Sequence, residues 1–217
     1  MEWLNSWWAD VYEQIYATFV EGDRWQYLVK GIGNTIQIAF FAVLLGIVIG
    51  VIVALIKVFT AGNKKFRWLE IIANIYLTVI RGTPMVVQLL VFHFALFPLW
   101  GWNNITPVQV SIIVFGLNSG AYISEIMRSG IQSVVPGQME AGRAVGLSFG
   151  ASMTKIVIPQ AVKNILPTLG NEFIALIKET SVVSFVGAAD LYVAFSYIAA
   201  NSYEYMVPYL VMAMIYI

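Results

Sequence analysis

The stretch "GIGNTIQIAFFAVLLGIVIGVIVALI", from Gly31 to Ile56, contains no charged side chain. At 1.5 Å per residue, a helix of this length exceeds the hydrocarbon core of a bilayer, which is roughly 30 Å thick. The stretch therefore predicts a membrane-spanning helix. Small residues recur at every fourth position within it, namely Ala42, Gly46, Gly50 and Ala54. Because such a stripe lets another helix backbone approach closely, we expect it to pack against a second span.

The composition extends this prediction to the whole chain. Of its 217 residues, 59% are hydrophobic and only 11% are charged, which is too little polar material to cover a water-soluble globule. The chain has no cysteine and one histidine, so we expect no disulfide, thiol chemistry or histidine-rich metal site. Balanced charges without a basic stripe argue against a nucleic-acid partner. We expect an all-α membrane protein with about five transmembrane helices.

The other spans follow from further apolar stretches. They are predicted at about residues 68–100, 105–127 and 164–186, and a fifth begins near Tyr203. The second is longer than one span requires and contains Pro84, where we expect a kink. The segment between the fourth and fifth spans, residues 187–202, predicts a loop or a short interfacial helix. Because the fifth stretch has fewer than the roughly 20 residues of a span, we expect it to be truncated in this sequence.

Basic residues predict the orientation. They gather in two loops that are separated by two spans, and they are Lys57, Lys64, Lys65 and Arg67 in the first loop and Arg128, Arg143, Lys155 and Lys163 in the second. The positive-inside rule places both loops in the cytoplasm, so the single preceding span puts the N-terminus outside. We divide the chain into an external or interfacial segment, residues 1–30, whose tryptophans and tyrosines suit the outer interface, and a transmembrane domain, residues 31–217.

The second of these loops, about residues 133–163, contains the stretch "EAGRAVGLSFGASMTKIVIP" at 140–159. Pro136 can start a short helix, because a proline at the first position loses no internal hydrogen bond. Gly146 can end that helix in a left-handed conformation without steric cost. A second helix with one apolar face is expected to follow and to stop at Pro159. Two short helices held under the membrane predict a docking device.

At these residues the sequence resembles the permease subunits of bacterial binding-protein-dependent ABC importers. Their cytoplasmic signature is Glu-Ala-Ala, three residues, Gly, nine residues, then Ile-x-Leu-Pro. This sequence reads "EAGRAVG", a nine-residue gap and "IVIP", with Gly142 and Ile158 as departures. The stretches "GIGNTIQIA", "RGTPMVVQLL", "NSGAYISEIMRSGI" and "LPTLGNEFIALIKETS" are similar to the polar amino-acid uptake branch. The similarity covers about residues 31–190.

The resemblance implies a multi-pass permease subunit of the bacterial inner membrane, with residues 31–217 as its permease domain. Its implied partners are a second permease, either the same or a sister chain, a cytoplasmic ABC ATPase dimer, and an external binding protein that delivers an amino acid. ATP and Mg²⁺ would belong to the ATPase, because this sequence has no Gly-x-x-x-x-Gly-Lys-Ser/Thr loop. The chain itself is then expected to be no enzyme and to bind no cofactor. The residues expected to couple it to the ATPase are Glu140, Ala141, Gly146, Phe149, Met153 and Pro159.

Several charged side chains fall inside predicted spans, and they are Arg81, Glu125, Glu172, Lys178 and Glu179. Each costs roughly 2.5–3.5 kcal/mol at mid-span, so each must be paired or useful. In one interpretation they bind an amino acid, whose carboxylate meets Arg81 or Lys178 while its ammonium meets a glutamate or Asn118. In the other, they pair with one another and hold the bundle together. For Glu125, three residues before Arg128, a structural pair is favoured.

Three other functions stay open at this point. The chain could be an ABC permease for a different small solute, a membrane scaffold, or an ion-coupled secondary transporter that works alone. In the last case Glu172 and Glu179 would be proton or sodium sites. Secondary transporters usually contain an internal repeat, and we find none in the sequence, so the amino-acid importer is favoured.

Overall fold

The computed structural model describes residues 2–60 and 64–217, with the side chains of residues 2–7, 59 and 64 left out. Parts of two sequence predictions lie outside the described residues: Met1 and the Trp3 and Trp7 side chains of the N-terminal segment, and the Lys64 side chain of the first basic loop. Every regular element in the described ranges is a helix, which confirms the predicted all-α fold.

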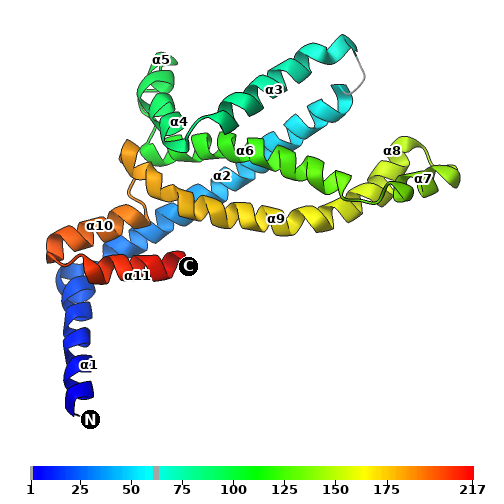
Figure 1. Cartoon of the computed structure of the whole chain (residues 1–217). Helices are drawn as coiled ribbons and strands as arrows, with labels where there is room; N and C mark the ends of the chain where they lie inside the picture. The colour runs from blue at the N-terminus through cyan, green and yellow to red at the C-terminus, as the bar shows by residue number, and fades with distance from the viewer. Residues whose placement is uncertain (1, 61–63) are drawn as a thin grey trace.

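Three long helices form the body of the molecule (Figure 1): α2 (Trp25–Thr60), α6 (Pro107–Gln132) and α9 (Ile158–Glu179). The α2 helix begins at Trp25, earlier than the predicted span, because residues 25–30 contain no proline or glycine to interrupt the backbone hydrogen bonds. The predicted boundary between residues 30 and 31 therefore lies inside one continuous helix.

The small-residue stripe of α2 packs against α6, as the sequence predicts. A Cβ added at Gly46 would lie 3.0 Å from Ser119, and one at Gly50 would lie 2.7 Å from Ile123. The α6 helix also contributes a glycine to this contact, since a Cβ added at Gly116 would lie 2.6 Å from Leu45 of α2. Larger residues at these positions would hold the two backbones apart, so the glycines set the spacing of the two helices.

The predicted second span is a sharply bent pair of helices. After the short turn η3 (Lys64–Phe66), α3 (Arg67–Gly82) meets a second arm at 110°. That arm consists of α4 (Met85–Val91), η4 (Phe92–Leu96) and α5 (Phe97–Leu99). Thr83 and Pro84 are both extended at the bend. The predicted kink at Pro84 is confirmed, because proline disfavours a helical conformation in the residue before it.

The connection between α6 and α9 is a helical hairpin of α7 (Pro136–Ala144) and α8 (Phe149–Ser152). The predicted stop at Pro159 is wrong, because α8 continues through the π-helical turn η5 (Met153–Val157) into α9. In η5 the backbone N–H of Ile158 donates to the carbonyl of Met153, five residues back. This wider turn accommodates the hydrogen bond and the space that a proline removes from a regular helix.

Beyond α9 the chain forms three further helical pieces. The 3₁₀ turn η6 (Thr180–Val186) ends at a left-handed Gly187, and Asp190 then caps α10 (Leu191–Ser202), where the sequence left open a loop or a short helix. The last helix is α11 (Met206–Tyr216). By length and composition, α2 and α6 can each cross a membrane alone, and two bent pairs, Arg67–Gly82 with Met85–Leu99 and Phe149–Val186 with Leu191–Ser202, can each supply one more span.

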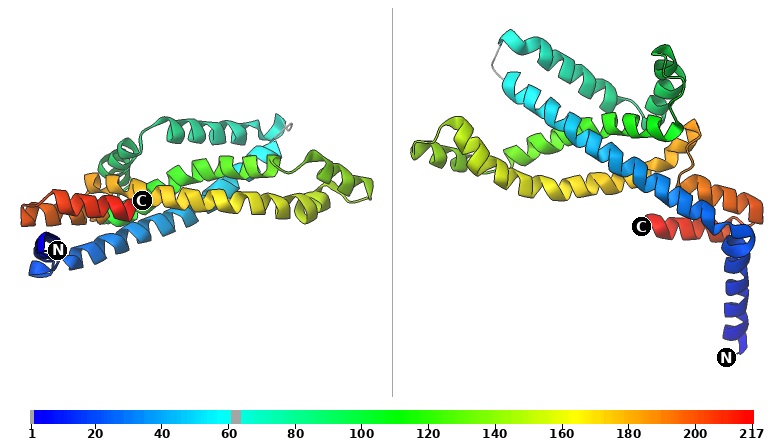
Figure 2. Two further views of the ribbon diagram at one scale, coloured as in Figure 1. Left: turned by 60° about the horizontal axis from the view of Figure 1, so that its bottom comes forward. Right: turned by 180° about the vertical axis from the view of Figure 1, so that it is seen from behind.

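The N-terminal segment is also helical. The first helix, α1 (Glu2–Ile15), leads through η1 (Tyr16–Val20) and η2 (Glu21–Asp23) into α2. Figure 2 shows that α1 and the hairpin lie at opposite ends of the long helices. The two ends of the bundle therefore carry different elements. One end carries α1, α10 and the start of α2, and the other carries the hairpin.

Candidate functional site

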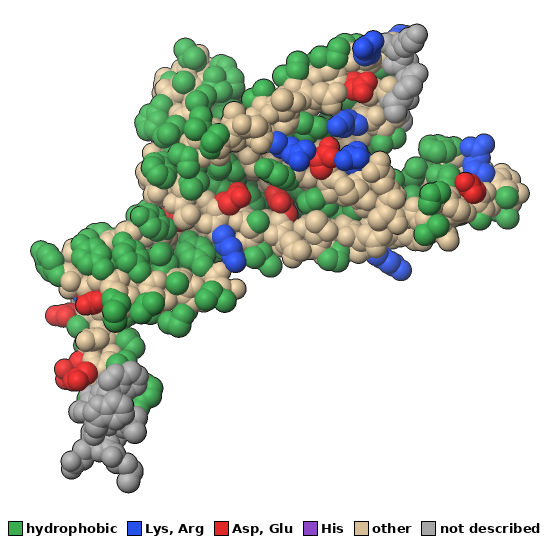
Figure 3. Space-filling model, in the orientation of Figure 1, with side chains coloured by type: hydrophobic (Ala, Val, Ile, Leu, Met, Phe, Trp, Pro, Cys, Tyr) green, Lys and Arg blue, Asp and Glu red, His purple; other side chains and the backbone are tan. Residues whose placement is uncertain are grey.

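A polar groove separates α6 from α9 in the half of the bundle that leads toward the hairpin. It has a volume of about 420 Å³ and is lined by Tyr122, Glu125, Ile126, Ser129, Gly130, Ser133, Asn164, Thr168 and Glu172. At one end of the groove, the Ser119 hydroxyl donates a hydrogen bond of 2.8 Å to Glu172 Oε1. In Figure 3 the acidic and basic side chains of the central face gather between α3 and α9.

Glu125 forms the ion pair that the sequence favours. Its carboxylate accepts from Arg128 at 2.6 Å and lies 3.6 Å from Lys57 Nζ. One carboxylate of the groove wall is therefore neutralised by two cations that lie outside the groove lining. Because the Lys57–Glu125 contact joins the end of α2 to α6, removing either of these two partners would also disturb the bundle.

Arg81 reaches the groove through an aromatic contact. Its guanidinium lies 5.5 Å from the centre of the Tyr122 ring, and Tyr122 is itself part of the groove wall. The Arg81 side chain is exposed and makes no ion pair within the described residues. A cation held against a ring is attracted by the negative face of the π system and keeps its hydrogen-bond donors available. Arg81 can therefore offer donors to an anionic group.

The Asn118 side chain is part of a buried hydrogen-bond network of amides. Its Nδ2 donates to Gln88 Oε1 at 3.3 Å, and Gln88 Nε2 in turn donates to the carbonyls of Ile80 and Thr83 at 2.7 and 2.9 Å. These carbonyls belong to the bend before Pro84, where the helical hydrogen bonds are interrupted. Gln88 therefore satisfies the bent backbone from inside the bundle. The sequence analysis missed Gln88, although a glutamine inside an apolar run four residues after a proline is a usable signal.

The remaining two predicted site residues point in different directions. Glu179 lies two helical turns beyond Glu172 on the same side of α9. Lys178 instead lines a separate hollow with Ser181, Tyr192, Met212, Ala213, Tyr216 and Ile217. The structure thus brings Glu172 and Glu125 into one groove with Arg81 beside it, and it places Lys178 elsewhere.

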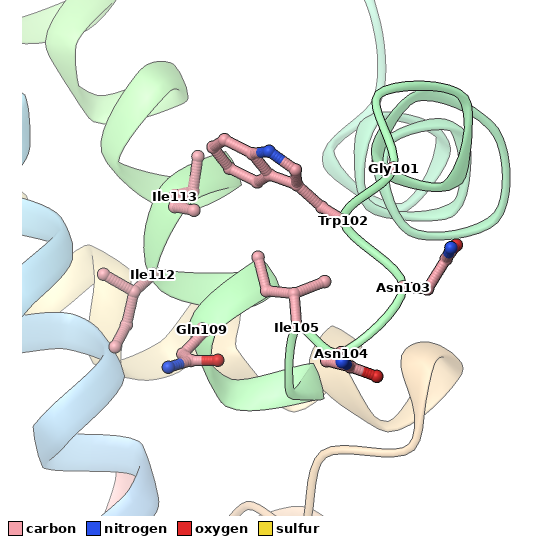
Figure 4. A pocket seen from close by; sticks show the side chains of 8 residues that line it. All are labelled: Gly101, Trp102, Asn103, Asn104, Ile105, Gln109, Ile112 and Ile113. Atoms are coloured by element: carbon pink, nitrogen blue, oxygen red, sulfur yellow. The ribbon is translucent and has the colours of Figure 1, made fainter.

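A second hollow lies where α5 turns into α6, at the end of α6 remote from the hairpin. It measures about 450 Å³ and is lined by Gly101, Trp102, Asn103, Asn104, Ile105, Gln109, Ile112 and Ile113. Figure 4 shows Trp102 reaching across toward Ile113, with the amides of Asn103, Asn104 and Gln109 around the rim. Gln109 also completes a capping box with Thr106. The sequence analysis placed residues 101–104 between two predicted spans and predicted no site there.

The turn of the hairpin is built around Gly146. This residue has φ +86°, as predicted, and follows the end of α7. The N–H of Gly146 donates to the carbonyl of Arg143, and the N–H of Leu147 donates to that of Gly142, both at 3.1 Å. These two bonds define a Schellman motif, in which a left-handed glycine closes a helix. Ser148 then caps α8 through a bond from the N–H of Ala151.

The two arms of the hairpin touch closely at Gly142. A Cβ added there would lie 2.8 Å from both Ser152 Oγ and Ile156 Cδ1. Glycine in place of the alanine of the signature therefore permits a tighter contact between α7 and the second arm. This close approach sets how near α7 lies to the second arm of the hairpin.

The outer surface of the hairpin is apolar in its centre. Val145 and Phe149 are 78% and 54% exposed, and Ala141 and Glu140 are exposed beside them. Met153 is partly buried and packs against a small core of Val134, Val157, Ala161 and Ile165. The predicted coupling residues therefore divide into surface positions and one anchor, while Pro159 lies exposed in the first turn of α9. Val145 is a surface residue that the sequence analysis missed.

A bundle of apolar helices that encloses a polar groove, and that carries an exposed helical hairpin at one end, defines a membrane component with a place for a partner protein. Residues 42–217 match the family described as binding-protein-dependent transport system inner membrane component. The chain belongs to this family.

Individual relatives agree with this assignment. Over 190 residues, 88% of this chain and 84% of the relative, the chain is 40% identical to a putative glutamine transport system permease protein GlnP of Rickettsia bellii. Over the same shares it is 35% identical to the arginine transport system permease protein ArtQ of Bacillus subtilis. A solved structure described as an amino acid ABC transporter with histidines aligns with a TM-score of 0.79 at 39% identity, and the alignment covers 88% of this chain and 86% of that one.

Proposed function

We propose that this chain is the permease subunit of an ATP-driven importer that moves polar amino acids from an external binding protein into the cytoplasm. The observation that carries the proposal is the direct connection between the hairpin and the groove. One uninterrupted helical path, α8 through η5 and α9, joins Phe149 on the hairpin surface to Glu172 on the groove wall. A force on the hairpin is therefore applied to the helix that lines the groove.

The hairpin is the proposed seat of a cytoplasmic ABC ATPase. Val145 and Phe149 offer the exposed apolar centre, and the carboxylate of Glu140 offers a polar contact at its edge. Exposed apolar groups grouped in this way mark protein interfaces. That ATPase would bind ATP together with Mg²⁺ and hydrolyse the ATP, so the permease itself would be no enzyme. The basic residues near the hairpin support a cytoplasmic location by the positive-inside rule, which leaves α1 outside.

The groove between α6 and α9 is the proposed inner part of the solute pathway. Glu172 and Glu179 offer acceptors for an ammonium group, and the Arg81 guanidinium offers donors for a carboxylate. Asn118 acts through Gln88 by holding the bend that carries Arg81 in place. Lys178 lies outside this groove and is left out of the proposed solute contacts. An amino acid has both charges, which matches a wall that offers both kinds of partner.

ATP can drive alternating access only if it favours one state of the transporter over the other. In this chain the difference would act at the hairpin, because that is where the ATPase binds. Two permease subunits, identical or sister chains, would enclose the pathway between them, and the external binding protein would dock at the opposite end. The names of the relatives, which include glutamine, arginine and amino-acid systems, support an amino acid as the solute.

Solute-stimulated ATP hydrolysis tests this proposal. The chain is co-expressed with the ATPase and binding protein from its own operon, and the purified complex is placed in liposomes. We expect hydrolysis to rise when binding protein loaded with one polar amino acid is added on the outer side. Co-purification without any stimulation across a panel of amino acids would limit the chain to another solute, and failure to retain the ATPase would contradict the proposal itself.

A further inference from the structure

The first helix, α1, runs across the direction of the long helices. In Figure 1 and in the right-hand view of Figure 2 it extends away from the start of α2 and runs crosswise to α6 and α9. Since α2 and α6 are the helices long and apolar enough to cross a membrane, a helix transverse to them lies along the membrane plane. Its position at the end remote from the hairpin puts it at a membrane surface.

The two sides of α1 differ in chemistry. Tyr12 and Ile15 lie on one side and are 68% and 44% exposed, and Tyr12 stacks on Tyr16 with ring centroids 6.3 Å apart. Asp10 and Glu13 lie on the other side and are also exposed. A helix with an exposed aromatic side and an exposed charged side can lie in a membrane interface, with the aromatic side toward lipid and the charged side toward water.

The direction of α1 is fixed by contacts at its junction with α2. The Arg24 guanidinium donates to the carbonyl of Ala17 at 2.6 Å and to that of Asn201, at the end of α10, at 3.2 Å. Phe19 meets Phe195 of α10 edge to face, with centroids 6.1 Å apart. These contacts tie the turn between α1 and α2 to α10, so α1 leaves the bundle in a defined direction.

The same end of the bundle carries a group of exposed aromatic side chains. They are Trp25 and Tyr27 at the start of α2, Tyr197 on α10, and Tyr203 and Tyr205 before α11. Tyr27 and Tyr197 contact each other with centroids 4.2 Å apart. Tryptophan and tyrosine concentrate at the level of the lipid headgroups, so this group of aromatic side chains marks one interface of the membrane. Tyr12 of α1 and Tyr16 of η1 extend this group of aromatic side chains away from the bundle.

We propose that α1 lies flat in this membrane interface, with Tyr12, Ile15 and Tyr16 among the lipid headgroups and upper acyl chains and with Asp10 and Glu13 toward water. The occupant of its aromatic side is lipid. No basic residue occurs between residues 2 and 23, so the contact does not depend on anionic lipid. Because Arg24 joins the turn to the end of α10, α1 anchors that end of the bundle at a fixed depth.

The absence of cysteine from the sequence makes the test direct. Single cysteines are introduced as Asp10→Cys, Tyr12→Cys, Glu13→Cys and Ile15→Cys in the full chain, purified with its associated subunits, spin-labelled and placed in liposomes of a zwitterionic lipid. The accessibility of each label to oxygen, which concentrates in the bilayer, and to a water-soluble nickel chelate is measured. Val48→Cys, on the exposed mid-section of α2, gives the lipid reference, and the same spin label free in buffer gives the water reference.

We expect the oxygen-to-nickel ratio at positions 12 and 15 to resemble that of position 48, and the ratio at positions 10 and 13 to shift toward that of the free label in buffer. Nickel access equal to the water reference at all four positions would place α1 in water and overturn the proposal. Low access to both reagents at positions 12 and 15 would mean that protein covers this side, which would overturn it in favour of a partner subunit. Ile15→Cys keeps both tyrosines, so it reports even if Tyr12→Cys weakens the contact.

Discussion

The left-handed turn at Gly146 gives the sharpest prediction about the hairpin. An L-residue in the left-handed conformation costs roughly 1–2 kcal/mol, and a β-branched residue there is a genuine outlier. A Cβ at Gly146 would meet nothing within 4 Å, so the whole penalty of Gly146→Val comes from the backbone. A penalty of this size changes a conformational equilibrium by a factor of about 5–30. If it is relieved by opening the turn, the two Schellman hydrogen bonds are lost and Phe149 is misplaced.

A matched control exists four residues away. Gly150 also has open space around its Cβ position, and its φ is not positive, so Gly150→Val adds the same side chain to the same hairpin without the backbone penalty. We expect Gly146→Val to reach the membrane in normal amount and to bind the ATPase with apparent affinity reduced by up to about 5–30-fold, since only the correctly folded fraction binds. Titration of the purified permease with its ATPase measures this. Equal affinities for the two variants would refute the reasoning.

Three further predictions concern the bundle. Gly50→Val should press the added side chain against α6 and lower the free energy of unfolding by about 1–3 kcal/mol. A thermal melt in detergent measures this, and an unchanged melting temperature would mean that the two helices are not in contact there. Gln88→Leu should leave the buried Ile80 carbonyl at the bend without this partner, at about 1–3 kcal/mol, and a variant as stable as the parent would show that the network does not hold the bend. Glu172→Gln should reduce amino-acid uptake in a complex that still assembles, whereas Lys178→Gln should leave uptake unchanged; the reverse pattern would move the pathway to the other side of α9.

Local chemistry explains what the sequence could predict. The charge-free run in α2, the proline that begins α7 and the glycine that closes it act within a few residues, so their effects follow from the sequence alone. The small-residue stripe in α2 also predicted a close helix contact, although the partner helix could not be named. These features suffice for the all-α membrane fold and for the shape of the hairpin.

The differences arise where distant segments meet. Pro159 was expected to stop a helix. Instead, the π-helical turn before it accommodates the proline, and the helix continues into α9. Gln88 serves carbonyls across a bend, and Gly142 faces Ser152 on the other arm of the hairpin. Lys178 and Glu179 are sequence neighbours that face different surroundings. None of these relations is visible before the chain is folded.

The central claim is that ATP, acting through the hairpin, drives amino-acid uptake along the groove. Uptake of a radiolabelled amino acid is measured in liposomes that contain the permease with its ATPase and binding protein, with ATP on the hairpin side and with all ion gradients collapsed. The account predicts accumulation that requires ATP and is unaffected by the loss of the gradients. Uptake that persists without ATP or without the ATPase, and that stops when the gradients collapse, would contradict it and identify an ion-coupled transporter.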